Sequence, residues 1–140
     1  MITNEGELTR EEWMFPAMLG LVILGLACLG DLGREWLRFD ATAIASGQWW
    51  RIWTGHWVHA SWYHLLLNGL GLVILLLLCP ERLKLHWWWF RLALMCALTS
   101  AGLYWFGHDV KWYVGLSGVL HGFYLLGLRR PAFAGDRIAL

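Results

Sequence analysis

The stretch HLLLNGLGLVILLLLC, residues 64–79, decides the fold class because it is almost continuously apolar. Apolar residues at every third or fourth position indicate a helix on the surface of a soluble protein, whereas an unbroken run points to lipid as the solvent. Only the histidine and the asparagine near its start are strongly polar. The run therefore predicts a membrane helix, and similar runs occur elsewhere in the chain.

The overall composition places the whole chain in the same class. Hydrophobic residues make up 59% of the 140 residues and charged residues only 15%, against about a quarter charged in soluble domains. The net charge of +1 provides no basic surface for nucleic acid, so nucleic-acid binding is excluded. Cys28, Cys79 and Cys96 lie in or beside apolar runs without a CxxC pair, and we interpret them as packing or lipid-facing thiols.

The apolar runs predict an all-α, polytopic membrane helix bundle with four spans. Each run is close to the roughly 20 residues that a helix needs to cross a bilayer, and Trp and Tyr mark the run ends. The predicted spans are residues 13–30, 57–79, 87–106 and 112–128. Residues 31–56 mix tryptophans with charges, so we expect short amphipathic elements in the outer interface. Residues 1–140 are interpreted as a single membrane domain.

The basic residues predict how the bundle is oriented in the membrane. An acidic leader precedes the first span, which argues against a cleaved signal peptide. Lysines and arginines on the side of the N-terminus outnumber those on the other side by seven to four, and cytoplasmic loops carry the excess. The N-terminus and the C-terminal tail are therefore predicted to be cytoplasmic. The seven are Arg10, Arg82, Lys84, Arg91, Arg129, Arg130 and Arg137.

Two polar residues interrupt the second apolar run. His64 and Asn68 are four positions apart, so they share one face of a helix. Polar groups inside a bilayer are costly unless they face the bundle interior or water, which makes them candidates for function. The alternative is a hydrogen-bonded pair that joins two helices. From these two residues alone, both interpretations stay open.

The fourth apolar run contains a serine between glycines. Its sequence GLSG, residues 115–118, is followed by His121 and Gly122. Glycines weaken a helix but allow close approach of a neighbour, and Gly118 and Gly122 also form a small-xxx-small face typical of helix packing. A hydroxyl with an imidazole and a carboxamide supplies the nucleophile and oxyanion donors of an acyl-transfer site. The missing group is a base for the serine.

Two separated motifs together resemble the rhomboid family of intramembrane serine proteases. The first is a Trp-Arg loop, GQWWRIWT at residues 47–54, followed by the helix HLLLN at residues 64–68. The second is GLSG at residues 115–118, which is similar to the nucleophile motif of the family. The longer string YVGLSGVLHG, residues 113–122, resembles one branch, the rhombosortases. The likeness covers residues 47–122, over half of the chain.

The resemblance implies a role for each matching residue. Ser117 would be the nucleophile, and His64, Asn68 and the backbone N–H of Ser117 would form the oxyanion hole. Gly115 and Gly118 would be the motif glycines. The implied activity is cleavage of single-span membrane proteins. For rhombosortases, the implied substrates carry a C-terminal tail with a Gly-Gly motif, a membrane helix and a basic end, in the inner membrane of Gram-negative bacteria.

The chain departs from the family pattern in one respect. The family's general base is a histidine on a later membrane helix, and the residues after Arg130 contain no such helix. We therefore expect either a C-terminally incomplete domain or a shortened relative that is inactive as given. His121 lies four residues after Ser117, and helical side chains lean toward the N-terminus. It is the candidate substitute base, or else it orients substrate.

Two functions from different classes remain open. One is a serine endopeptidase of the rhomboid type, and the other is a non-catalytic, rhomboid-like binder of membrane proteins. The motif residues favour the enzyme, and the missing base helix favours the binder. No cofactor is expected, and a metal site from His56, His59 and His64 is disfavoured because no acidic or cysteine partner is near them. The expected partners are transmembrane protein substrates and the lipid bilayer.

Overall fold

The computed structural model describes residues 10–78 and 84–133, most of which are helical. The long helices are α1 (Arg10–Ala27), α5 (Trp62–Leu78), α6 (Leu85–Phe106) and α7 (Ser117–Phe133). The short elements between α1 and α5 are α2 (Gly30–Leu37), β1 (Phe39–Asp40), α3 (Ala41–Ala45) and α4 (Arg51–Thr54). The strand β2 (Trp112–Tyr113) precedes α7. The all-α helix bundle predicted from the sequence is confirmed.

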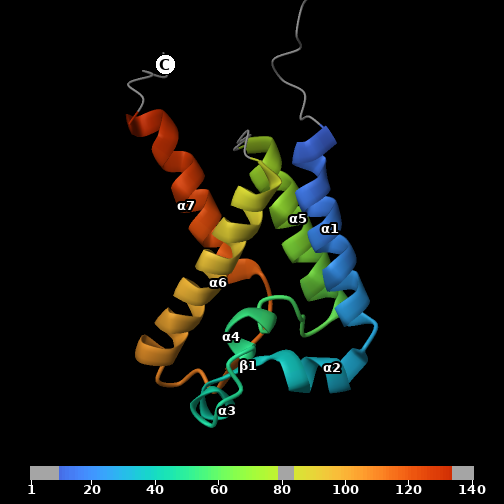
Figure 1. Cartoon of the computed structure of the whole chain (residues 1–140), viewed down its shortest axis with the longest axis vertical. Helices are drawn as coiled ribbons and strands as arrows, with labels where there is room; N and C mark the ends of the chain where they lie inside the picture. The colour runs from blue at the N-terminus through green and yellow to red at the C-terminus, as the bar shows by residue number, and fades with distance from the viewer. Residues whose placement is uncertain (1–9, 79–83, 134–140) are drawn as a thin grey trace, which may run out of the picture.

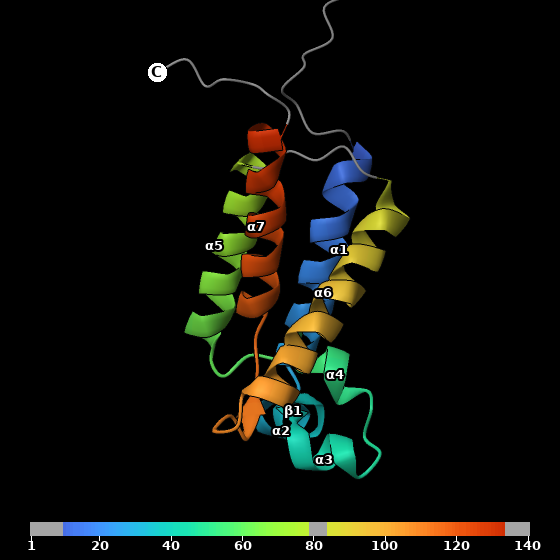
Figure 2. The same ribbon diagram turned by 90° about the vertical axis from the view of Figure 1, so that its left-hand side faces the viewer.

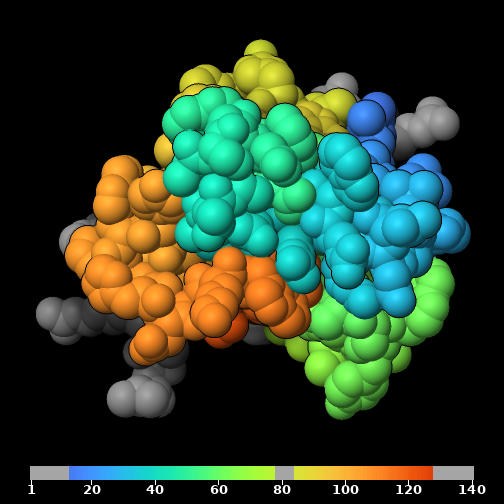
Figure 3. Space-filling model, turned by 90° about the horizontal axis from the view of Figure 1, so that it is seen from below, coloured from blue at the N-terminus to red at the C-terminus, as the bar shows by residue number. Residues whose placement is uncertain are grey.

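The long helices form a bundle whose two ends differ. Helices α1 and α7 each contact both α5 and α6. In the side view, α5 lies beside α7 and α1 lies beside α6 (Figure 2). The short elements α2, α3 and α4 gather at the lower end of the bundle, whereas α1 begins and α7 ends at the upper end (Figure 1). Seen from below, these short elements and the segment before α7 cover much of the lower end (Figure 3).

A helix forms in each of the four stretches that were predicted to span a membrane. Within residues 10–78 and 84–133, no helix taken singly is both long and apolar enough to cross a membrane. Residues 13–27 of α1 and helix α2 meet that requirement as a pair, with a bend of 112° between them. Cys79, Arg82 and Arg137 lie outside the described residues. The predicted orientation of the bundle in the membrane stays a prediction.

Five predicted boundaries are wrong by three residues or more. Helix α1 begins earlier than predicted, at Arg10, and α7 ends later, at Phe133, while the other three boundaries have structural causes. The first helix was expected to reach residue 30, but it ends at Ala27, and Gly30 takes φ +61° and begins α2. The second was expected from residue 57 but begins at Trp62. Here the Ser61 hydroxyl accepts a hydrogen bond from the His64 backbone N–H at 3.1 Å and caps the helix.

The third of these boundaries lies beside the candidate nucleophile. The fourth span was expected from Trp112, but Trp112 and Tyr113 form β2 and pair antiparallel with β1. Gly115 then takes φ +105°, a left-handed conformation that favours glycine. Helix α7 can therefore begin only after this turn, at Ser117.

The core lies where α1, α6 and α7 meet. Phe15 of α1 stacks on Trp88 of α6, with ring centroids 5.2 Å apart and an interplanar angle of 15°. Helices α6 and α7 approach closely at Gly122, where a Cβ would lie 2.8 Å from the Met95 sulfur. The small-xxx-small face of the sequence therefore packs against α6. The buried core side chains are Phe15, Leu19, Ile23, Leu75, Trp88, Leu92, Cys96, Leu116, Val119, Leu120 and Phe123.

The buried guanidinium of Arg51 organises residues 31–56. Its Nε donates to the Gln48 side chain at 2.7 Å, and one terminal nitrogen donates to the carbonyls of Glu35 and Arg38 at 2.9 and 2.8 Å. Burial is the main cause that lowers the pKa of Arg51. Arg51 thus binds two backbone carbonyls at the end of α2 through one nitrogen and Gln48 through another, which the single ammonium nitrogen of a lysine could not reproduce.

Candidate active site

Ser117 occupies the first position of α7, directly after the Gly115 turn. The first N–H groups of a helix have no partner within the helix, and the helix dipole makes this end positive. A hydroxyl here is therefore close to backbone donors that can stabilise negative charge on oxygen. Ser117 is half-buried. The local geometry suits a nucleophile more than a core serine.

The imidazole of His64 lies against the same turn. A Cβ at Gly115 would be 2.5 Å from His64 Cε1 and 2.7 Å from its Nε2, so only glycine leaves room for the ring. His64 is in the first turn of α5, and α5 packs along α7. The structure thus brings His64 to the backbone of the nucleophile motif. No hydrogen bond between His64 and Ser117 is present in the described part of the chain.

Asn68 lies one turn further along α5 and is 5% exposed. Its Nδ2 donates to the His64 backbone carbonyl at 2.9 Å, while its buried Oδ1 has no hydrogen-bond partner among the described residues. It also lines a cavity of about 670 Å³ between α1 and α5, together with Leu116. His64 and Asn68 therefore share one helical face. No hydrogen bond from either side chain to another helix is found among the described residues.

His121 reaches Ser117 through the backbone and not through the hydroxyl. Its Nδ1 lies 2.7 Å from the Ser117 carbonyl oxygen, and because a carbonyl only accepts, Nδ1 must carry a proton. The side chain is exposed. No hydrogen bond from His121 to Ser117 Oγ is found in the described structure. To act as a base, the ring would have to leave this carbonyl.

Tyr113 is a site residue to which the sequence argument gave no role. Its hydroxyl lies 3.0 Å from Ser117 Oγ and accepts a hydrogen bond from the Gly118 backbone N–H, also at 3.0 Å. The residue belongs to β2, whereas Ser117 begins α7, so the turn at Gly115 folds Tyr113 back over the helix end. The signal in the sequence was a tyrosine four positions before the serine, which has meaning only once this turn is known.

A second histidine–serine pair lies behind the site and was also missed. His56 is fully buried, with Nε2 2.9 Å from Ser100 Oγ, and that hydroxyl donates to the Ile52 carbonyl at 2.7 Å. Since the Ser100 proton is used on the carbonyl, its oxygen accepts from His56 Nε2–H. Burial lowers the pKa of His56 to about 4. This pair anchors residues 31–56, the first loop, to α6 and does not activate a nucleophile.

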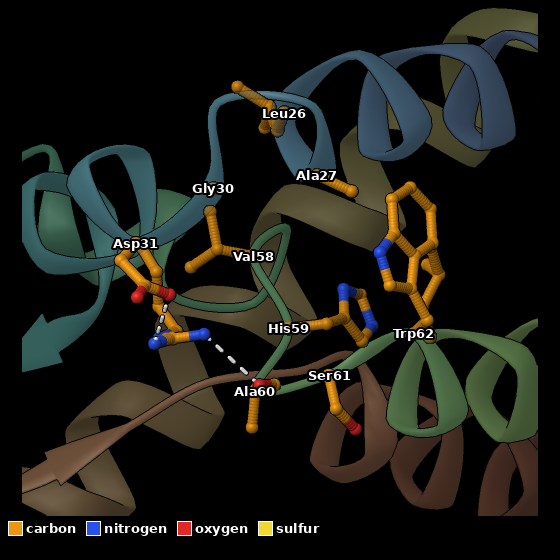
Figure 4. A pocket seen from close by; sticks show the side chains of 11 residues that line it. Leu26, Ala27, Gly30, Asp31, Val58, His59, Ala60, Ser61 and Trp62 are labelled. Atoms are coloured by element: carbon orange, nitrogen blue, oxygen red, sulfur yellow. Dashed lines mark hydrogen bonds and ion pairs between the residues drawn. The ribbon is translucent and has the colours of Figure 1, made fainter.

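His59 lies between the first loop and His64. It is 9% exposed, neither ring nitrogen has a hydrogen-bond partner in the described structure, and its ring centroid is 5.2 Å from that of His64. Burial, and then the neighbouring His64, lower the pKa of His59 to about 4. His59 lines a cavity of about 210 Å³, with Trp62 on the α5 side and Asp31 on the α2 side (Figure 4).

The fold and the site define a class of protein: a helix bundle that presents a serine at a helix N-terminus beside an imidazole. The rhomboid domain family model matches residues 46–130, which is 85 of the 140 residues. This chain belongs to the rhomboid family. Members are membrane-embedded and are in general serine proteases that act on membrane proteins within the bilayer. A search of curated proteins found no match.

Proposed function

We propose that this protein is an intramembrane serine endopeptidase in which Ser117 is the nucleophile. The observation that carries the proposal is the position of Ser117 at the start of α7, with His64 against the Gly115 turn. Both motifs lie within the range matched by the rhomboid domain model. The alternative roles for these polar residues, helix packing and intrahelical hydrogen bonding, do not require a glycine turn that fits an imidazole.

In the proposed reaction, Ser117 Oγ attacks the carbonyl carbon of the scissile peptide while its proton passes to a base. The carbonyl oxygen becomes an oxyanion, which the backbone N–H of Ser117 and the side chains of His64 and Asn68 would stabilise by donation. Collapse breaks the C–N bond, the leaving amine takes a proton, and water hydrolyses the acyl-enzyme. Asn68 would donate with Nδ2, which has a second N–H besides the one bound to the His64 carbonyl.

Two roles are open to His121. As a base, its ring must turn from the Ser117 carbonyl to Oγ; as a substrate-orienting group, it keeps Nδ1 on the carbonyl and offers Nε2 to the incoming chain. The observed hydrogen bond supports the second role. The base then has to be a different imidazole, as in the family pattern of a histidine on a later helix.

We propose single-span membrane proteins as substrates, specifically proteins with a Gly-Gly C-terminal sorting tail. This part of the proposal rests on the likeness of residues 113–122 to the rhombosortase motif. It implies the inner membrane of a Gram-negative bacterium. The excess of Lys and Arg on the side of the N-terminus supports a cytoplasmic N-terminus. The chain as a whole is proposed to be one rhomboid-like domain.

The test uses the protein expressed from its complete reading frame together with a Gly-Gly-tailed membrane substrate. Ser117→Ala should abolish cleavage and labelling by a fluorophosphonate probe, at unchanged protein level. The matched control is Ser46→Ala, because Ser46 is exposed on the first loop and its hydroxyl bonds only the Ala43 carbonyl in the described structure. Cleavage at the wild-type rate by Ser117→Ala would remove Ser117 from the mechanism.

One observation favours the second candidate, a non-catalytic binder of membrane segments. The hydrogen-bond partner of Ser117 Oγ is the phenol of Tyr113, and no imidazole shares this bond in the described residues. A binder would retain a Gly-Gly-tailed protein in co-purification while the wild-type chain neither cleaves it nor reacts with the probe. An enzyme would instead release a shortened product.

A further inference from the structure

The side chain of Tyr113 is held in place from three directions. Its backbone pairs with Phe39 across the β1–β2 ladder, which ties it to the first loop. Its ring lies 5.5 Å, centroid to centroid, from the buried ring of His56. A Cβ at Gly118 would lie 3.2 Å from the Tyr113 hydroxyl, so the glycine of the motif leaves space for it. The phenol is therefore fixed at the end of α7 by contacts that do not involve Ser117.

By distance alone, either oxygen could donate in the bond between the phenol and Ser117 Oγ. The phenol oxygen already accepts from the Gly118 backbone N–H at 3.0 Å. If the Ser117 hydroxyl also donated to it, the phenol proton would have no partner at this site. If the phenol donates to Ser117 Oγ instead, the phenol accepts from Gly118 and donates to the serine. The serine proton is then free to reach a base.

We propose that Tyr113 is a positioning residue whose O–H donates to Ser117 Oγ, so that it orients the hydroxyl and stabilises negative charge that develops on this oxygen. The catalytic consequence rests on the proposed function, whereas the hydrogen bond itself does not. Hydrogen bonds to a charged acceptor are stronger than those to a neutral one. The bond therefore strengthens as the serine loses its proton, and it weakens once Oγ is acylated.

A merely structural Tyr113, which only caps the Gly118 N–H, is the interpretation to exclude. The two interpretations predict different pKa values for a thiol placed at the position of Ser117 Oγ. In Ser117→Cys the thiol titrates whether or not the protein is a protease. If the phenol donates to position 117, it stabilises the thiolate, and its removal raises the pKa of the introduced thiol. If the phenol only caps the Gly118 N–H, its removal leaves this pKa nearly unchanged.

The experiment measures the rate of alkylation by iodoacetamide against pH for Ser117→Cys in the protein from its complete reading frame. The background carries Cys28→Ser, Cys79→Ser and Cys96→Ala, which remove the other thiols of residues 1–140, and any further cysteine of the reading frame is replaced by serine. Adding Tyr113→Phe should raise the pKa of the introduced thiol by roughly one unit, the size expected for one hydrogen bond to a charged group. An unchanged pKa would overturn the proposal.

Tyr124→Phe is the matched control, because the Tyr124 hydroxyl also binds a backbone group, the Gly71 carbonyl at 2.7 Å, and lies on the same helix α7. It should leave the thiol pKa unchanged. If Tyr113→Phe does not fold, 3-fluorotyrosine in place of Tyr113 keeps the shape and makes the phenol a stronger donor. It should then lower the thiol pKa, and no change or a rise would overturn the proposal.

The consequence for catalysis is measured separately with Ser117 intact. In Tyr113→Phe, the maximal rate of fluorophosphonate labelling should fall about tenfold, as expected for the loss of one hydrogen bond of typical strength. The half-saturating probe concentration should stay constant. If the wild-type protein neither labels nor cleaves, the proposed function fails while the thiol result still decides the role of Tyr113.

Discussion

We expect acid to destabilise the folded protein through His56, by an amount that follows from its environment. The ring is fully buried, its Nε2–H donates to Ser100, and its Nδ1 has no partner in the described structure. A second proton would therefore enter at Nδ1 and create a buried cation, whose loss of hydration outweighs the attraction of the nearby Gly115 and Cys96 backbone. Burial lowers the pKa of His56 to about 4, from an ordinary value of about 6.5.

The direction of the pH effect follows from the lowered pKa. Above pH 6.5 His56 is neutral in both the folded and the unfolded chain, so its contribution to stability is fully present. As the pH falls from about 6.5 to about 4, the unfolded chain takes up a proton first, and stability is lost. A difference of about 2.5 pKa units corresponds to roughly 3 kcal/mol in the free energy of unfolding. For a domain of this size, that lowers Tm by about 6–12 °C.

The assay is thermal unfolding of the purified protein in detergent micelles, followed by tryptophan fluorescence at pH values from 7.5 to 4. His56→Gln can still donate to Ser100 but does not titrate. Its Tm should therefore fall by about 6–12 °C less than that of the wild type over this range. His59, whose pKa is also about 4, is present in both proteins, so the difference isolates His56.

The matched control is His108→Gln, since His108 is exposed in the segment after α6. It should show the same loss of Tm on acidification as the wild type. Equal pH dependence of the wild type and His56→Gln would refute the reasoning. It would mean that His56 binds its second proton as readily in the folded chain as in the unfolded one.

Two further predictions concern the site itself. His64→Ala and Asn68→Ala should each reduce turnover about 10²–10³-fold in the protein from its complete reading frame, because each removes one of the proposed oxyanion donors. Normal turnover, or failure to accumulate, would favour a structural role. Gly115→Ala should lower the free energy of unfolding by roughly 2–4 kcal/mol, since a side chain at φ +105° is strained and would meet His64. Gly69→Ala on α5, where a Cβ meets nothing within 4 Å, is its control, and equal stability of the two variants would contradict the account.

The helices could be predicted from sequence because their signal is local. Unbroken apolar runs placed a helix in each of the four stretches, and this part of the prediction was confirmed. Three of the wrong boundaries were set by contacts that composition does not reveal. The start of α7 depends on the pairing of Trp112 and Tyr113 with residues more than seventy positions earlier, Phe39 and Asp40, and on the left-handed conformation of Gly115.

The candidate site was predictable only as a set of residue types. The spacing of His64 and Asn68 and the glycines around Ser117 identified them, through the resemblance, before any geometry was known. Tyr113 and the His56–Ser100 pair could not be found in this way. Their partners are contributed by a turn of the backbone and by α6, and a lone tyrosine or serine in an apolar chain carries no pattern of its own.

The first loop and the candidate nucleophile are structurally continuous, which explains why the Trp-Arg loop and the serine motif occur together. Arg51 fixes the carbonyls of Glu35 and Arg38, and the next residue, Phe39, pairs with Tyr113. The Gly115 N–H donates to the Gly55 carbonyl at 3.1 Å, so the same loop also holds the turn. A disturbance at Arg51 can therefore reach Ser117 through the backbone, without any direct contact between the two side chains.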